Sequence, residues 1–173
     1  MLKTILIIVV LAIAVILFLA ARKPDNFHVE RSATIHAPPE KIQGMLSDFH
    51  QWSEWSPWEK LDPAMTRTFG GTPSGPNSTY AWTGNSKVGE GRMEILSSSP
   101  SKVAIKLDFL KPFEAHNTAT FALAGSGDNT SVVWSMDGPT PFVSKVMQVF
   151  MNMDAMIGKD FEKGLANLKA AAE

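Results

Sequence analysis

The sequence predicts an α+β fold: a seven-stranded antiparallel sheet wrapped around a long C-terminal helix, preceded by an N-terminal transmembrane helix. Three observations predict it: an uninterrupted apolar run near the N-terminus, a series of short alternating segments in the middle, and a long apolar stripe of helical period at the end. The 173 residues suffice for one domain and an appendage, because a domain commonly takes about 100–200 residues. We therefore expect a membrane anchor over residues 1–23 and one folded domain over residues 24–173.

The N-terminal segment contains no Gly, Pro or charged residue from Ile5 to Ala21 and lies between Lys3 and the pair Arg22-Lys23. A membrane-spanning helix needs about 20 apolar residues, with a lower limit of roughly 17. The run is therefore just long enough to cross a bilayer.

A cleaved signal peptide is the alternative reading of this segment. Cleavage needs small residues at two positions before the site, and Phe18 and Leu19 fit that requirement poorly. We therefore expect a retained, single-pass anchor. The flanking positive charges nearly balance, so the expected orientation, with the N-terminus in the cytoplasm and the domain on the extracytoplasmic side, rests on the default of uncleaved signals.

The first predicted strand covers residues 27–35, where apolar and polar side chains alternate after the polar hinge Pro24-Asp25-Asn26. Arg31 breaks the alternation because it falls on the apolar side. It marks a bulge, a strand end or an inward-pointing cation, and we favour the first two.

A short helix and a tryptophan-rich segment come next. Pro38 and Pro39 suit the first turn of a helix, where an amide hydrogen would have no partner, and the apolar residues after them recur with helical spacing. Residues 48–58 then contain three tryptophans within seven residues. Such a cluster forms a cavity wall, a plug over a cavity, or an ordinary corner of the core.

Six further strands are predicted between residues 65 and 137, separated by clusters of Gly, Pro, Asn and Ser. They are Met65–Phe69, Thr79–Thr83, Val88–Leu96, Val103–Leu110, Ala115–Leu123 and Thr130–Met136.

The segment after Pro141 has the apolar period of one long helix that runs to the C-terminus. Its first half is apolar over most of its circumference, which indicates cover by the sheet on one side and by ligand, loop or membrane on another. Four of the 9 methionines lie between Met147 and Met156. Their flexible thioethers suit a wall that adapts to varied apolar shapes, and they serve equally well as core filler.

The composition argues against several classes of function. The chain has no Cys, which removes disulfides and thiolate chemistry. Its formal charge of −1, without a basic run, argues against a nucleic-acid partner. Its 4 histidines lack metal-ligand spacing. We expect neither a metal nor a cofactor.

The order of the elements resembles the START-like, or Bet v 1-like, superfamily of SRPBCC proteins, in particular the bacterial polyketide cyclase/dehydrase and lipid-transport group. The resemblance covers about residues 27–169. The segments that carry it are Ile35–Ile42, Asp48–Glu59, Tyr80–Asn85, Val88–Gly91 and Phe161–Lys169. It implies a helix-grip fold that binds apolar molecules between sheet and helix. Because some members have added catalysis, the fold alone does not fix the activity.

Catalysis would need a polar group of perturbed pKa that points into the cavity and is held by a second group. The polar candidates are Asp48, Glu94, Asp108, His116 and Asp137. Glu94 and Asp108 alternate with apolar neighbours and are expected to face water, and His116 is expected to be an exposed imidazole at a strand start. No nucleophile, base and orienting group stand together in the sequence.

The leading interpretation is a membrane-anchored domain that binds a lipid or another apolar small molecule. A polyketide cyclase-like or dehydratase-like enzyme and a protein-interaction or chaperone-like module are the alternatives. The residues expected on or near the cavity are Trp55, Trp82, Trp134, Met136, Met147 and Met151.

Overall fold

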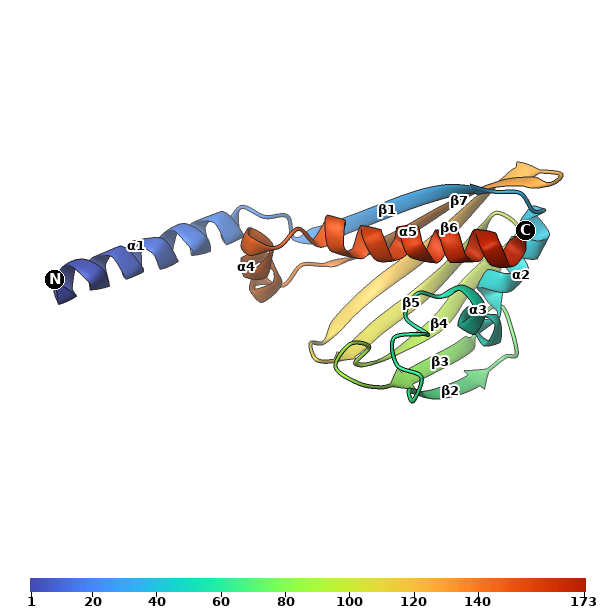
Figure 1. Ribbon diagram of the computed structural model, residues 1–173, viewed down its shortest axis with the longest axis horizontal. Coiled ribbons are helices and arrows are strands. Elements are labelled where there is room, and N and C mark those ends of the chain that lie inside the picture. The colour runs from blue at the N-terminus through green and yellow to red at the C-terminus, as the bar shows by residue number, and fades with distance from the viewer.

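A computed structural model describes residues 1–173. It contains one seven-stranded antiparallel sheet with strand order β1-β7-β6-β5-β4-β3-β2 (Figure 1). The strands are β1 (Asn26–Ile35), β2 (Thr66–Gly71), β3 (Ser78–Thr83), β4 (Glu90–Ser99), β5 (Lys102–Lys111), β6 (Ala115–Ser126) and β7 (Asn129–Pro139). All seven predicted strands are present, so the predicted α+β helix-grip fold is confirmed.

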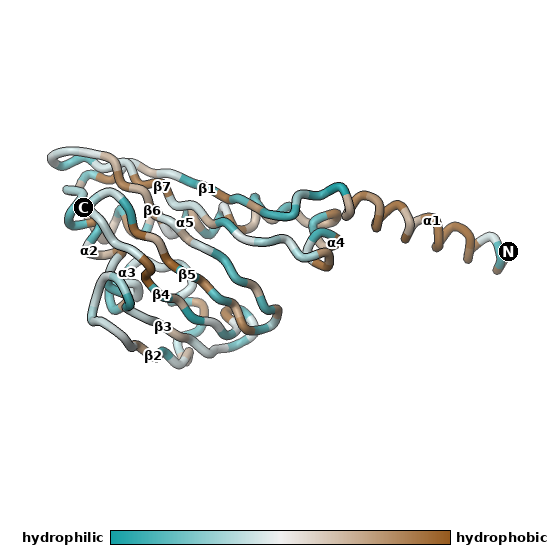
Figure 2. The backbone as a smooth tube through the Cα atoms, turned by 180° about the vertical axis from the view of Figure 1, so that it is seen from behind, coloured by the Kyte–Doolittle hydropathy of each residue, from teal (hydrophilic) through white to brown (hydrophobic).

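Five α-helices and one 3-10 turn complete the chain. The helices are α1 (Leu2–Ala21), α2 (Pro39–Ser47), α3 (Trp52–Trp55), α4 (Phe142–Phe150) and α5 (Met153–Ala172), and the 3-10 turn is η1 (Phe49–Gln51). The long helix α5 runs along the sheet, and α3 packs against it (Figure 1). Helix α1 extends away from the sheet as a continuous hydrophobic rod (Figure 2). It is long and apolar enough to cross a membrane.

Side-chain alternation in the strands decides which face of the sheet is the core. In β6, Ala119, Phe121 and Leu123 are buried, whereas Thr118 and Ala122, which point to the other face, are exposed. The buried face packs against α5, α2 and the tryptophan segment and forms one core cluster of 26 buried residues. Burial of these apolar side chains, at about 25 cal/mol per Å² removed from water, is the main force that holds sheet and helix together.

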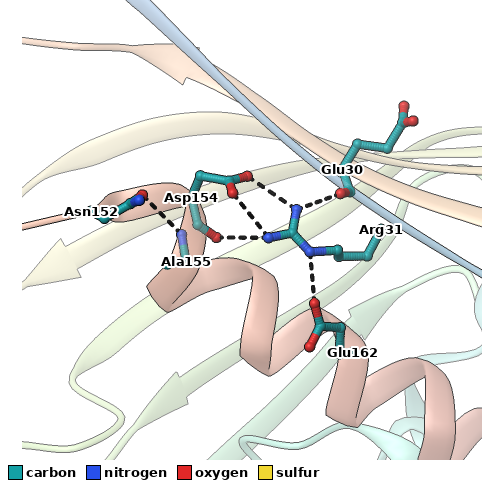
Figure 3. Close-up of polar contacts among 6 residues, drawn as sticks. All are labelled: Glu30, Arg31, Asn152, Asp154, Ala155 and Glu162. Carbon is teal, nitrogen blue, oxygen red and sulfur yellow. Dashed lines mark hydrogen bonds and ion pairs between the residues drawn. The ribbon is translucent and has the colours of Figure 1, made fainter.

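The predicted irregularity at Arg31 is wrong. Strand β1 pairs with β7 without a break, and Arg31 lies opposite Trp134. The third alternative holds, because the guanidinium group points inward onto α5 (Figure 3). There its Nη1 and Nη2 atoms donate to both carboxylate oxygens of Asp154 at 3.0 Å, and its Nε donates to Glu162 at 2.9 Å.

The predicted single C-terminal helix is also wrong, because the chain breaks between α4 and α5. Met151 has extended backbone angles, and the side chain of Asn152 accepts a hydrogen bond from the amide of Ala155 at 3.1 Å, so that Asn152 caps α5 (Figure 3). Asparagine is among the best residues for satisfying the free amides of a first helical turn. The cap gives α5 a start of its own, and α4 turns away from it.

Candidate ligand-binding cavity

A cavity of about 410 Å³ lies between the concave face of the sheet and α5. Of the 29 residues that line it, 18 are hydrophobic. Its inner end is formed by side chains that are almost entirely buried, including Trp52, Tyr80, Trp134 and Phe161. A largely apolar space of this size is typical of small-molecule sites, which measure about 300–1,000 Å³.

The aromatic side chains of the cavity wall pack against one another, which restricts their motion. The indole of Trp134 stacks on Phe161 with 4.1 Å between ring centroids and meets the edge of Trp58 at 5.7 Å. On the other side, the Nε1 of Trp82 donates to the carbonyl of Val88 at 2.9 Å, which fixes that ring at the wall. Offset and edge-to-face contacts of this kind contribute about 0.5–1.5 kcal/mol each beyond area burial.

One polar residue, Asn117, lies in the middle of the apolar sheet surface. Its neighbours across the sheet are Leu107 on β5 and, by the register of β6 and β7, Gly138. Gly138 makes room for it, because a Cβ at position 138 would lie 2.0 Å from the Oδ1 of Asn117. That Oδ1 is buried without a protein hydrogen-bond partner. A buried amide oxygen without a partner costs about 1–3 kcal/mol, so a donor group that reached it would remove that cost.

Two further polar atoms of the cavity wall are buried without a partner. They are the Nε1 of Trp134 and the Oγ1 of Thr140. An indole N–H only donates, whereas a hydroxyl both donates and accepts. Like the Oδ1 of Asn117, both atoms are covered by protein atoms, so a guest reaches them only if the surrounding side chains shift.

A buried carboxylate, Glu59, stands at the opposite wall and is fully engaged by the protein. The hydroxyl of Tyr80 donates to its Oε1 at 2.5 Å, and the Nε of Arg67 donates to its Oε2 at 2.7 Å. Burial and the hydrogen bond to Glu59 raise the pKa of Tyr80, so the phenol stays neutral. Because both carboxylate oxygens are occupied, this group supports the wall more readily than it abstracts a proton.

The residues predicted from sequence to bind ligand fall into three groups. Trp82, Trp134 and Met136 lie on the cavity wall. Trp55 is fully buried behind it, 5.7 Å from the ring of Trp134. Met147 and Met151 lie on an exposed surface at α4, away from the wall, because the helix break turns α4 outward. The sequence prediction placed these two methionines on or near the cavity, and neither is among the residues that line it. Whether the others bind a ligand stays a prediction.

The polar candidates for catalysis lie outside the cavity core. Glu94 faces away from it, and Asp48 caps η1 by accepting from the amide of His50 at 3.0 Å. His116 and Asp137 are more than half exposed, and Asp137 pairs with His28 at 2.7 Å. His116 also borders the cavity mouth.

Asp108 corrects one sequence expectation. It lies on the outer face of the sheet, as its alternation predicts, yet its side chain is only 2% exposed because Arg92, Lys106 and His116 cover it. Burial acts to raise the pKa of this carboxyl, but the hydrogen bonds from His116 and Arg92 and the charge of Lys106 outweigh burial and lower it. Asp108 is the centre of an outer-face charge cluster.

Sequence reasoning missed Asn117, Glu59 and Tyr80. The signal for Asn117 and Tyr80 was present in the strand alternation, because Asn117 shares the apolar face of Phe121 and Tyr80 shares that of Trp82. A polar residue on a buried face usually has a specific partner. Glu59 left no such signal, because it lies in an irregular loop.

The fold and the cavity together define a helix-grip domain of the START-like, or Bet v 1-like, superfamily. The family model for polyketide cyclase / dehydrase and lipid transport matches residues 26–173, and the protein belongs to this family. A search of curated protein sequences found no significant match.

Solved structures show the same fold at low sequence identity. Protein CV1439 from Chromobacterium violaceum is 13% identical, with a TM-score of 0.59 over 87% of this chain and 99% of its own. The Aha1 dimer from Colwellia psychrerythraea is 17% identical, with a TM-score of 0.59 over 85% of this chain and 96% of its own. Protein MLL2253 from Mesorhizobium loti is 18% identical, with a TM-score of 0.57 over 83% of this chain and 98% of its own. At such identities the likeness establishes the fold alone.

Proposed function

We propose that this protein is a membrane-anchored binding domain for a lipid-like small molecule, mostly apolar with one or two hydrogen-bonding groups. The observation that carries the proposal is the largely apolar cavity between the sheet and α5, whose wall also contains buried polar atoms without a partner. Apolar contact supplies affinity roughly in proportion to the area removed from water, while the few polar groups orient the guest.

The family description supports the same class of ligand, because it names lipid transport beside polyketide cyclase and dehydrase activities. We propose further that α1 is retained as a single-pass anchor and that the domain lies on the extracytoplasmic side. Protease treatment of right-side-out membrane vesicles tests the orientation. Digestion of the domain without lysis is expected, and protection until lysis contradicts it.

Filling the cavity tests the binding function. Ala119 is buried in the wall, and Ala122 lies three residues further along β6 on the outer face. Ala119→Phe should abolish calorimetric binding of a panel of fatty acids and aromatic hydrophobes, whereas Ala122→Phe should leave it unchanged. Circular dichroism checks that both variants fold. Equal binding by both variants, or none by the unaltered protein across the panel, would contradict the proposal.

An enzymatic role is the second candidate, because Glu59 and Tyr80 form a buried polar pair at the wall. Mass spectrometry of ligands incubated with the protein tests it. Turnover that disappears in Glu59→Gln while binding persists would favour catalysis over simple binding.

A further inference from the structure

Helix α4 turns its apolar side chains outward and its polar side chains toward the protein, the reverse of what is usual for a helix in water. Its outward residues Val143, Met147 and Phe150 recur at i, i+4 and i+7, so they share one face. They are 68%, 43% and 70% exposed, although α1 packs beside the helix. The polar residues of α4 face the protein: Ser144 lines the cavity and Lys145 is buried.

The buried lysine fixes this orientation. The Nζ of Lys145 lies 2.5 Å from the Oδ1 of Asp25, in the link between α1 and β1. The amide of Thr140, just before α4, donates to the carbonyl of Asp25 at 2.7 Å. These two bonds hold α4 to the link that follows α1, with the apolar face turned away from the domain.

The link also limits how far α4 can lie from the end of α1. Only residues 22–25 separate α1 from β1. Four extended residues span at most about 14 Å, less than the thickness of one leaflet. If α1 crosses a bilayer, α4 lies at the surface of that bilayer, as its position beside the end of α1 indicates (Figure 1).

The cavity opens at this same end of the sheet. Strand register places the β3–β4 turn, the β5–β6 turn and the β7–α4 link together there. Several cavity-lining residues of these segments are exposed, notably Phe113 at 68%, while the inner wall is buried. The mouth and the apolar face of α4 are therefore neighbours.

The charges around α4 suit a lipid surface. The carboxylates in the segments that flank it, Asp25 and Asp154, are paired with Lys145 and Arg31. The cations after α1, Arg22 and Lys23, make no ion pair and lie where phospholipid head groups would meet them. An amphipathic helix with such flanks binds in the plane of the membrane interface.

We propose that α4 lies in the interface of the bilayer that holds α1, so that the cavity mouth faces the membrane and its ligand enters from the lipid phase. This inference rests on the proposed membrane anchor and binding cavity, and it names the source of the ligand. The single occupant of the apolar face of α4 is the phospholipid surface.

Spin labelling of the full chain tests the docking directly, because the protein has no Cys and single cysteines can be introduced freely. Val143→Cys and Phe150→Cys report on α4, and Val10→Cys reports on α1. Leu96→Cys is a matched control, because Leu96 is a 51% exposed apolar residue on the sheet. Labelled proteins are reconstituted into vesicles of phosphatidylcholine and phosphatidylglycerol, and relaxation by oxygen is compared with relaxation by a water-soluble nickel chelate.

The α4 labels should be more accessible to oxygen than to nickel, and the label at position 96 should show the opposite preference. Nickel-accessible labels at both α4 positions would overturn the proposal. In that case the label at position 10 shows which proposal has failed. If this label lies in hydrocarbon, α1 spans the bilayer and only the docking of α4 fails. If it lies in water, the proposed membrane anchor fails as well.

A second experiment tests the entry route. In a double variant, Val143→Asp with Phe150→Asp, transfer of doxyl-labelled stearic acid from vesicles to the protein should slow several-fold, with binding of the same fatty acid from detergent solution unchanged. Leu96→Asp should change neither. Unchanged transfer from vesicles to the double variant would contradict entry through the membrane-facing mouth. If the unaltered protein did not bind the fatty acid from detergent solution at all, the result would instead count against the proposed function.

Discussion

Asn117 distinguishes this cavity from one with a purely apolar wall. Its amide stands on the largely apolar inner surface of the sheet, beside Gly138, whose missing side chain leaves room for it. The amide oxygen is already buried without a partner, so a guest made only of hydrocarbon would leave that cost in place, whereas a donor group that reached the oxygen would remove it. We therefore predict that Asn117 gives the cavity a preference for a guest with a donor group.

Asn117→Leu should remove that selectivity. Leu has a similar shape and no polar atoms, so the variant should bind long-chain alcohols about 3- to 10-fold more weakly, the equivalent of one hydrogen bond, and bind matching alkanes no worse. Thr118→Val, on the opposite face of β6, is the control. Calorimetry with paired alcohols and alkanes measures the effect, and an equal loss for both ligand types would show that Asn117 acts through packing instead.

His116 links stability to pH through the outer-face cluster. Its hydrogen bond to Asp108 raises the pKa of the imidazole above its ordinary value of 6.5, against a smaller opposing effect of burial. A raised pKa in the folded state means that the folded protein holds the proton more tightly than the unfolded chain. The stabilisation is complete below the unfolded pKa and is lost as pH rises through the raised folded pKa.

The unfolding temperature should therefore fall between about pH 6 and pH 8.5, and His116→Gln should flatten that fall. His28 has a pKa raised in the same way by Asp137 and should account for part of the remaining slope. His36→Gln is the matched control, because the Nδ1 of His36 bonds to the side-chain Oδ1 of Asn129 at 2.6 Å and to no carboxylate. An unchanged slope in His116→Gln would show that the pair with Asp108 contributes nothing to stability.

At the scale of elements, the Arg31 cluster fixes the start of α5 against β1. The guanidinium bridges Asp154 and Glu162, which lie about two turns apart along α5, and it also donates to the carbonyl of Glu30 at 2.6 Å (Figure 3). Gly158 lets the arginine lie flat across α5, because a Cβ there would be 2.0 Å from the Nη2 of Arg31. The absence of a side chain at position 158 is thus a requirement of the neighbouring strand.

The effect of Gly158→Ala on stability should have opposite signs in the presence and in the absence of the Arg31 side chain. In the unaltered chain it should lower the unfolding temperature, because the new methyl group displaces the guanidinium from its carboxylates. In an Arg31→Ala background the same change should stabilise by about 0.8–1 kcal/mol, since alanine is the better helix former. Thermal unfolding of the four proteins measures this coupling, and additive effects would mean that Arg31 and Gly158 are independent.

The elements show why some features were predictable and others were not. Strand alternation placed Trp82 and Trp134 on the cavity side because alternation is a local property of the backbone. The inward direction of Arg31 was not local, because it depends on Asp154, which lies more than a hundred residues later in the chain. The break at Asn152 did leave a local capping signal, but the apolar period continues through Met151 and outweighed it.

At the scale of the whole molecule, the N-terminal helix and the folded domain differ in how well the sequence defines them. Length and composition alone predict α1, because a bilayer sets a simple requirement of about 20 apolar residues. The position of α4 beside α1 could not be predicted from the sequence, because it depends on the ion pair between Lys145 and Asp25. The arrangement of α1 and α4 at this end of the molecule is therefore a product of tertiary structure.

Retention of the anchor can be checked on the native protein. The intact mass of the protein from the membrane fraction should include residues 1–23, and alkaline carbonate should leave it in the pellet, because a buried span of this length does not depend on charge. A soluble chain that begins near Arg22 would contradict an uncleaved anchor and indicate a signal peptide.

The aromatic wall makes the protein its own optical probe. Of the 5 tryptophans, Trp52, Trp58, Trp82 and Trp134 line the cavity, and Trp55 packs 4.7 Å from Trp52. The single tyrosine, Tyr80, also lines it. Because α1 and α4 contain no indole or phenol, all near-ultraviolet emission arises around the cavity, and indoles this close together exchange excitation. A guest entering the cavity must therefore alter the intrinsic fluorescence of the whole chain, even in an intact membrane and without a label.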